Sequence, residues 1–193
     1  MKIGLYFGSF NPIHIGHLVI ANHITEFTDL NETWFVVTPH SPFKTKSSLL
    51  DNYQRLQMVH LATKDYTHLK PCDIEFNLPQ PNYTINTLVH LQEKYPNHEF
   101  ALIMGEDNLK GFHKWKNYEV ILEHHDIYVY PRISSETVET QLGNHKKTHH
   151  VAHAPVMEIS STFIRNAIKD GKNIKPLLPE HVWAYLDEMN FYK

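Results

Sequence analysis

The sequence alternates short apolar runs with stretches of helical periodicity, and this alternation constrains the fold more than any other feature. The first run, residues 3–7, is apolar except for one glycine and ends at Gly8, as expected of a strand buried on both faces. Over residues 16–27, apolar side chains recur at helical spacing. Strand, helix and strand in succession indicate βαβ units, and therefore a parallel sheet covered on both faces.

The same alternation continues to the end of the chain. Further strands are predicted over 34–37, 69–74, 100–104, 127–130 and 149–156. Helices are predicted over 16–27, after the N-cap residue Asp51, and over 83–94, 160–169 and 180–189. The fold class is α/β, a Rossmann-like doubly wound parallel sheet. We expect one domain over residues 1–193, with the C-terminal helices of about 160–189 packing as a small subdomain.

Composition narrows the class of protein. The 193 residues are 41% apolar and 20% charged, with a formal net charge of −3. That balance argues against a nucleic-acid or membrane-surface binder, which would show a basic excess. Cys72 is the only cysteine, which excludes an intrachain disulfide and fits a reducing compartment. The sequence contains no run of about 18 apolar residues, so it predicts no membrane span. We therefore expect a cytoplasmic protein, either monomer or homo-oligomer.

The first candidate site lies between the first strand and the first helix. His14 and His17 are three residues apart at the helix start, where free backbone N–H groups attract anions. Two imidazoles there can donate hydrogen bonds to phosphate oxygens. The alternatives are an ordinary turn with two surface histidines, or a zinc site that lacks a convincing further ligand. The segment reads Gly8-Ser9-Phe10-Asn11-Pro12-Ile13-His14-Ile15-Gly16-His17.

The second candidate site is the start of the helix over 160–169. Ser160 is a good N-cap, and Arg165 can reach back over the turn that carries Ser161 and Thr162. Hydroxyls, free N–H groups and a guanidinium would form a second anion site. The alternative is a capped helix with an arginine in solvent. The predicted core-facing stripe of this helix is Phe163, Ile164, Ala167 and Ile168.

Two phosphate-binding helix starts in one chain predict a ligand with several phosphates. The motifs of P-loop kinases and of ordinary dinucleotide dehydrogenases are missing from the sequence. The prediction requires the loop behind the first strand and the start of the late helix to face one cleft. It fails if His17 and Arg165 lie on opposite sides of the molecule.

The two segments together resemble the paired signature of the nucleotidyltransferase superfamily. More narrowly, the whole chain is similar to the bacterial nicotinate-nucleotide adenylyltransferase family. The resemblance implies transfer of an adenylyl group from ATP to nicotinate mononucleotide, with Mg²⁺ carried by ATP. The family often carries a second glycine where this chain has Phe7, and a Pro-His pair where it has Pro42-Phe43 before Lys44.

The resemblance also implies roles for particular residues. His17, His14, Arg165 and Lys44 would act on the phosphates at the reacting centre, and Trp115 would stack on the pyridine ring. The implied ATP-binding residues are Gly8, Ser9, Phe10, His14, His17, Gly105, Asp107, Ile159, Ser160, Ser161 and Arg165. The implied mononucleotide-binding residues are Asn11, Lys44, Tyr83, Thr84, Trp115 and Lys116.

Two other functions remain open from the sequence. The acceptor could be another phosphorylated molecule, such as nicotinamide mononucleotide or phosphopantetheine, although the Tyr83-Thr84 and Trp115 constellation favours the nicotinate nucleotide. The chain could also be a nucleotide sensor that has lost the chemistry. The histidine-rich stretch over 145–153 is interpreted as structural or solvent-facing, and no metal site made by the protein is expected.

Overall fold

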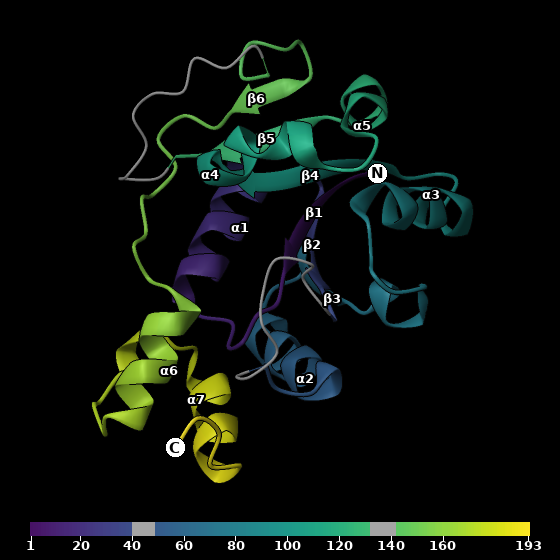
Figure 1. Cartoon of the computed structure of the whole chain (residues 1–193). Coiled ribbons are helices and arrows are strands. Elements are labelled where there is room, and N and C mark those ends of the chain that lie inside the picture. The colour runs from purple at the N-terminus through teal and green to yellow at the C-terminus, as the bar shows by residue number, and fades with distance from the viewer. Residues whose placement is uncertain (40–48, 132–141) are drawn as a thin grey trace.

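Six parallel strands form one sheet, in the order β3-β2-β1-β4-β5-β6, at the centre of the computed structural model (Figure 1). The structure describes residues 1–39, 49–131 and 142–193. This order confirms the predicted doubly wound sheet, because the winding direction reverses between the neighbouring strands β1 and β4. The strands are β1 (Lys2–Gly8), β2 (Glu32–Val37), β3 (Leu69–Cys72), β4 (Glu99–Gly105), β5 (Ile127–Tyr130) and β6 (Thr148–His150).

Helices cover both faces of this sheet. In the described part of the chain no helix is long and apolar enough to cross a membrane. The α-helices are α1 (Ile15–Phe27), α2 (Asn52–Thr63), α3 (Thr84–Lys94), α4 (Glu106–Lys110), α5 (Tyr118–His124), α6 (Ser161–Lys169) and α7 (Glu180–Glu188). Short 3₁₀ helices are η2 (Ile74–Asn77), η3 (Phe112–Lys114) and η4 (Lys175–Leu177).

The two faces of the sheet bury two separate hydrophobic clusters. Along β1, Leu5 belongs to the cluster under α3, α4 and α5, whereas the next residue, Tyr6, belongs to the cluster shared with α1, α2, α6 and α7. Successive side chains of a strand point to opposite faces, so a strand covered on both sides must be apolar throughout. This is why the continuous run over 3–7 identified β1.

The C-terminal helices lie at one end of the molecule, beside α2 and far from β6 and α5 (Figure 1). Helix α7 packs on α2, and residues of α6 and α7 share one hydrophobic cluster with α1 and α2. This arrangement places the start of α6 beyond the carboxyl edge of the sheet. The expected separate subdomain over about 160–189 stays a prediction.

Several element boundaries and burial predictions were wrong. Ile74 belongs to η2 and not to β3, and the last strand, over 148–150, overlaps the region predicted over 149–156 only at residues 149–150. Helices α4 and α5 were not predicted. Phe27 and Phe163 are 73% and 55% exposed, although both fit an apolar helical stripe. Phe163 stands at the edge of the stripe of α6, and only Ile164, Ala167 and Ile168 reach the core.

The histidine after α5 predicts a pH dependence of stability. His125 Nδ1 lies 2.8 Å from the Phe100 carbonyl, and burial lowers the pKa of His125 below its usual 6.5. Backbone hydrogen bonding to Phe100 opposes that shift, and His124 and Lys147 add to it. The unfolded chain therefore binds a proton at a pH where the folded chain does not, and stability falls as pH drops through about 6.5.

We expect the urea midpoint of the chain to fall between pH 7.5 and pH 5.5, and to fall less in His125→Gln. His60→Gln is the matched control, because His60 is exposed on α2 and does not contribute to the shift of the His125 pKa. Equal pH slopes for His125→Gln and the unsubstituted chain would contradict the prediction.

Candidate active site

The start of α6 lies directly against the loop that follows β1. Ser161 Oγ donates to the Pro12 carbonyl at 2.8 Å, and Arg165 Nη1 donates to the Asn11 carbonyl at 2.8 Å. These partners are 149 and 154 positions apart in the chain. The same loop ends in His14, the N-cap of α1. The two candidate anion sites therefore meet on one side of the molecule, as the sequence interpretation required.

A buried arginine that the sequence analysis missed holds the same loop from α2. Arg55 is fully buried, and its Nη1 donates to the carbonyls of Ser9 (2.6 Å) and Thr38 (3.0 Å). Its Nε donates to the Leu50 carbonyl at 3.0 Å, and its Nη2 to Asn52 Oδ1 at 2.6 Å. One guanidinium thus ties the loop after β1 to the end of β2 and to the start of α2.

The charge of Arg55 survives its burial. Burial lowers the pKa of Arg55 to about 10, and electrostatic interactions with Tyr192 and with the Asp51 carboxylate oppose the shift. The guanidinium therefore stays protonated near neutral pH, with neutral oxygens as its hydrogen-bond acceptors. The only signal in the sequence is an arginine on the helical face that also carries Met58 and Val59, which are both buried.

His14 and His17 form the start of α1 together. Their rings stack with centroids 3.7 Å apart and planes at 26°. The His14 backbone N–H donates to His17 Nδ1 at 3.2 Å. Because Nδ1 accepts this bond, the neutral His17 ring carries its proton on Nε2, which becomes the donor end. Gly16 makes room for this pair, since a Cβ there would stand 3.1 Å from His14 Nδ1.

Two of the predicted ligand residues are buried in the loop itself. Phe10 is 1% exposed as a whole residue and packs edge-on against Tyr6, His17 and Phe35, so it supports the loop from inside the protein. Asn11 is 3% exposed, and its Oδ1 accepts hydrogen bonds from the Leu50 N–H and the Tyr192 hydroxyl. The Asn11 side chain thus links the loop after β1 to Leu50 and to Tyr192.

The end of β4 lies next to the end of β1. Gly105 ends β4 and is the N-cap of α4, and Asp107 is exposed in the first turn of that helix. Gly105 is packed so closely that a Cβ would come 3.1 Å from the Tyr130 ring. The Tyr130 and Tyr6 hydroxyls are 3.1 Å apart beneath it. Gly105 and Asp107 thus occupy the switch point, where doubly wound folds bind ligands.

Some of the residues predicted to bind the acceptor lie around the start of α3, whereas Asn11 lies in the loop after β1. Tyr83 is the N-cap of α3 and Thr84 its first residue. Lys116 Nζ lies 4.5 Å from the centre of the Tyr83 ring, which joins two segments 33 positions apart. Trp115 is half-buried against Phe112, with ring centroids 5.2 Å apart.

Glu75, also missed from the sequence, supports this second group from behind. It is 2% exposed, and its Oε1 accepts a hydrogen bond from the Thr87 hydroxyl at 2.8 Å. Burial raises the pKa of Glu75, and hydrogen bonds with Thr87, Asn82 and Thr38 oppose the shift. Thr38 in turn donates its N–H to the Gly8 carbonyl at 2.9 Å. Glu75 therefore connects the start of α3 with the loop after β2 and, through Thr38, with the end of β1.

The remaining predicted residues divide into three cases. Ile159 is half-buried against the core, and Ser160 caps α6 by accepting a hydrogen bond from the Phe163 N–H at 3.1 Å. Lys44 lies outside the described residues.

In the histidine-rich stretch, His149 Nε2 lies 3.1 Å from Asp126 Oδ1, an exposed ion-pair contact. Across 1–39, 49–131 and 142–193, no three His, Cys, Asp or Glu side chains gather as a metal site.

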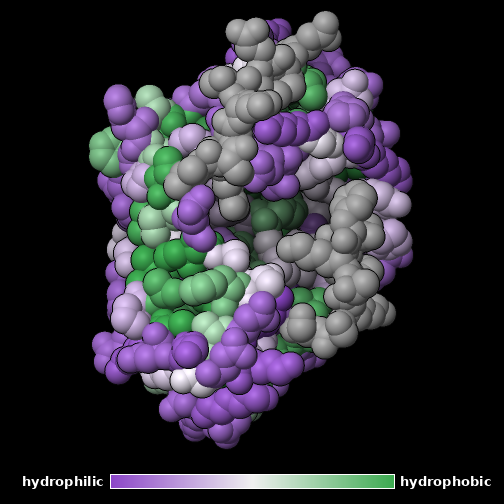
Figure 2. All heavy atoms as spheres, turned by 60° about the vertical axis from the view of Figure 1, so that its left-hand side comes forward, coloured by the Kyte–Doolittle hydropathy of each residue, from purple (hydrophilic) through white to green (hydrophobic). Residues whose placement is uncertain are grey.

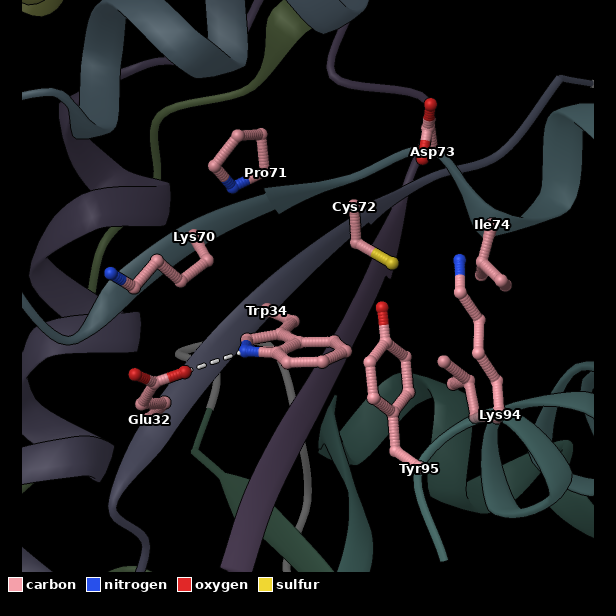
Figure 3. A pocket seen from close by; sticks show the side chains of 10 residues that line it. Glu32, Trp34, Lys70, Pro71, Cys72, Asp73, Ile74, Lys94 and Tyr95 are labelled. Carbon is pink, nitrogen blue, oxygen red and sulfur yellow. Dashed lines mark hydrogen bonds between the residues drawn. The ribbon is translucent and has the colours of Figure 1, made fainter. Parts of the chain in front are cut away.

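The described part of the chain shows a hollow on one face and a cavity over the sheet. Figure 2 shows a hollow near the centre of one face, with hydrophobic surface to one side of it and hydrophilic residues above and below. A separate cavity of about 290 Å³ lies over β2 and β3 and contains none of the predicted site residues (Figure 3). There the Cys72 thiol faces Tyr95, and Trp34 Nε1 donates to Glu32 at 2.8 Å. Burial raises the pKa of Cys72 to about 11, so this thiol is a poor nucleophile.

The bonds of Arg55 predict a large loss of stability in Arg55→Met. The substitution leaves the Ser9, Thr38 and Leu50 carbonyls without their donor, at a cost of about 3 kcal/mol or more in the free energy of unfolding. Urea denaturation measures it. Gln57→Met, at an exposed position of the same helix, should change stability by less than about 0.5 kcal/mol. Equal stabilities of the two variants would be incompatible with the assigned role.

Comparison with known proteins places the chain in a family. A family model described as cytidylyltransferase-like matches residues 5–167. A protein of Flavobacterium johnsoniae named "Probable nicotinate-nucleotide adenylyltransferase" is 70% identical over 193 residues, with 100% of both chains covered. A Bacteroides fragilis protein of the same name is 47% identical over 182 residues, covering 94% of this chain and 89% of the relative.

The fold is shared with solved structures as well. The Plasmodium falciparum nicotinic acid mononucleotide adenylyltransferase complexed with NaAD matches with a TM-score of 0.83 at 20% identity, covering 99% of this chain and 97% of the other. The two helix starts that meet on the loop after β1, and the switch point beside them, fit these similarities. The chain belongs to the nicotinate-nucleotide adenylyltransferase family of the cytidylyltransferase-like nucleotidyltransferases.

Proposed function

We propose that this enzyme transfers the adenylyl group of ATP to nicotinate mononucleotide, giving nicotinate adenine dinucleotide and pyrophosphate, a step of NAD biosynthesis. The observation that carries the proposal is the meeting of two helix N-termini on one loop at the switch point. Ser161 and Arg165 of α6 bond the same loop that ends in the His14 cap of α1. Each helix start offers N–H groups and partial positive charge to phosphate.

The loop itself supports the two helix starts. Its Ser9 and Pro12 carbonyls are bonded to Arg55 and Ser161. Phe10 and Ile13, which follow these two residues, are 1% and 0% exposed, so this part of the loop is packed inside the protein. The donors offered to the triphosphate are therefore those of the two helix starts and of the side chains beside them.

The reaction itself requires little covalent help from the protein. An oxygen of the mononucleotide phosphate forms a bond to the α-phosphorus of ATP, while the bond from that phosphorus to the bridging oxygen breaks and its electron pair leaves with pyrophosphate. The attacking oxygen is already anionic near neutral pH. Catalysis then rests on in-line positioning and on stabilising the charge that develops on the phosphates.

The residues share this work in a definite way. His17 donates from Nε2 to the phosphates at the reacting centre, and His14 supports it by stacking. Arg165 has five N–H donors, of which the bonds to Asn11 and Thr162 use two. Mg²⁺ enters with ATP as part of the substrate, because phosphate oxygens are ligands that suit it. Asp107 takes the ribose hydroxyls, and Lys44 contributes a further cation.

The second group of residues recognises the acceptor. A nicotinate carboxylate is stabilised by the start of α3 and by Lys116 over the Tyr83 ring, and the pyridine ring stacks on Trp115. An amide in place of the carboxylate loses the charge attraction. This electrostatic difference favours nicotinate over nicotinamide mononucleotide.

Pyrophosphate release from MgATP tests the proposal when it is measured with three acceptors in parallel. Nicotinate mononucleotide should give the highest kcat/KM, ahead of nicotinamide mononucleotide and phosphopantetheine. Release with phosphopantetheine alone would assign a different acceptor. Binding of ATP without turnover on any acceptor would make the protein a nucleotide sensor.

His17→Ala should lower kcat by about 100-fold or more and change KM far less, because the lost donor acts on charge that develops in the transition state. His23→Ala is the matched control on the same helix, since His23 stacks on the exposed Phe27 away from the loop. Steady-state kinetics of pyrophosphate release measures both variants. An unchanged kcat in His17→Ala would remove His17 from the mechanism.

Lys116→Gln should raise KM for nicotinate mononucleotide about three- to tenfold, which is the effect of one partly exposed cation on an anion. The KM for ATP should change less than twofold. Lys114→Gln removes an exposed lysine two positions away and is the control. If both substitutions raise the two KM values equally, Lys116 acts only through the general field of the protein.

A further inference from the structure

The last residues of the chain fold back onto the candidate active site. Asn190 and Tyr192 have φ angles of 54° and 66°, so the chain turns sharply after α7. Phe191 lies between them and is 8% exposed; its N–H donates to the Leu186 carbonyl at 3.1 Å. Its ring packs edge-on against Tyr185 at 5.6 Å. The buried Phe191 therefore fixes where the next side chain points.

That next side chain is Tyr192, and it reaches the loop after β1. The Tyr192 hydroxyl donates to Asn11 Oδ1 at 2.6 Å, across 181 positions of the chain. Asn11 Oδ1 also accepts from the Leu50 N–H at 3.2 Å, and its backbone carbonyl accepts from Arg165. Asn11 is thus held at two atoms by three segments that are distant in sequence.

The surroundings of Tyr192 keep its hydroxyl a neutral donor. Burial raises the pKa of Tyr192, and the charges of Arg165 and Arg55 oppose the shift. Both arginines also bond the loop, Arg55 at the Ser9 carbonyl and Arg165 at the Asn11 carbonyl. Tyr192 therefore lies near Arg55 and Arg165, which both hold the loop. Its hydroxyl bonds the side chain of Asn11, and the backbone carbonyl of Asn11 is bonded to Arg165.

We propose that Tyr192 is a positioning residue for adenylyl transfer, acting through Asn11 on the loop that leads to the His14 cap and to His17. The proposal rests on the proposed function for its reaction, but its geometry concerns only the triphosphate side of the site. Without the Tyr192 hydroxyl, Asn11 loses the shorter of the two bonds that its Oδ1 accepts from Tyr192 and Leu50. The segment from Asn11 to His14 is then held less firmly, and the start of α1 that carries His17 shifts relative to the start of α6.

Tyr192→Phe tests this with little change of shape, and Tyr185→Phe removes a hydroxyl from the adjoining helix as the control. We expect kcat/KM for ATP to fall about five- to tenfold in Tyr192→Phe, the effect of one buried hydrogen bond, and to stay within twofold in Tyr185→Phe. The Tm values of the two variants should agree within about 3 °C. Unchanged kinetics in Tyr192→Phe, or a loss equal in both variants, overturns the proposal.

A double-mutant cycle with Asn11→Ala tests the route. If Tyr192 acts through Asn11, the double variant is no slower than Asn11→Ala alone, whereas multiplying effects would show that Tyr192 acts elsewhere and overturn the proposal.

Calorimetric binding of α,β-methylene-ATP separates this proposal from the proposed function. The affinity should weaken about threefold or more in Tyr192→Phe and stay unchanged in Tyr185→Phe. If no acceptor turns over but this difference appears, the proposed function fails and the positioning of the loop stands. Equal affinities of the unsubstituted chain and Tyr192→Phe, or no binding by either, contradict the positioning role.

Discussion

The site depends on hydrogen bonds from distant donors to the carbonyls of one short loop. A loop at the edge of a sheet has no ladder partner for its polar groups, yet burial requires that each find one. Here Arg55, Ser161 and Arg165 supply the donors for Ser9, Pro12 and Asn11. The carbonyls of these peptides are thereby fixed toward the protein, and the loop holds the starts of α1 and α6 in one place.

The choice of arginine at position 55 has an electrostatic consequence. A buried charge is costly unless hydrogen bonds replace its water, and the bonds of Arg55 to carbonyls and to Asn52 do so without cancelling the charge. A carboxylate partner would have satisfied the guanidinium and also neutralised it. The neutral acceptors leave a positive potential beneath a loop that is suited to a triphosphate, in a site where screening by water is weak.

Sequence reasoning succeeded where the signal was local. Apolar runs identified β1 and β4, and Asp51 and Ser160 were recognised as caps from their own chemistry, because both accept hydrogen bonds within three residues. Helices α4 and α5 span five and seven residues, too few to show a period. Phe163 fits the stripe of α6, but only the packing of neighbours decides where a stripe ends.

The contacts that support the loop after β1 could not be predicted from the sequence, because they also depend on packing between distant residues. Arg55 and Tyr192 act on residues 46 and 181 positions away, and no spacing rule connects them. Their donors come from α2 and from the C-terminal segment, so the loop after β1 is held by parts of the chain that only the complete fold brings together. A local pattern can indicate where such a loop lies, but the donors that fix its shape are a property of the tertiary structure.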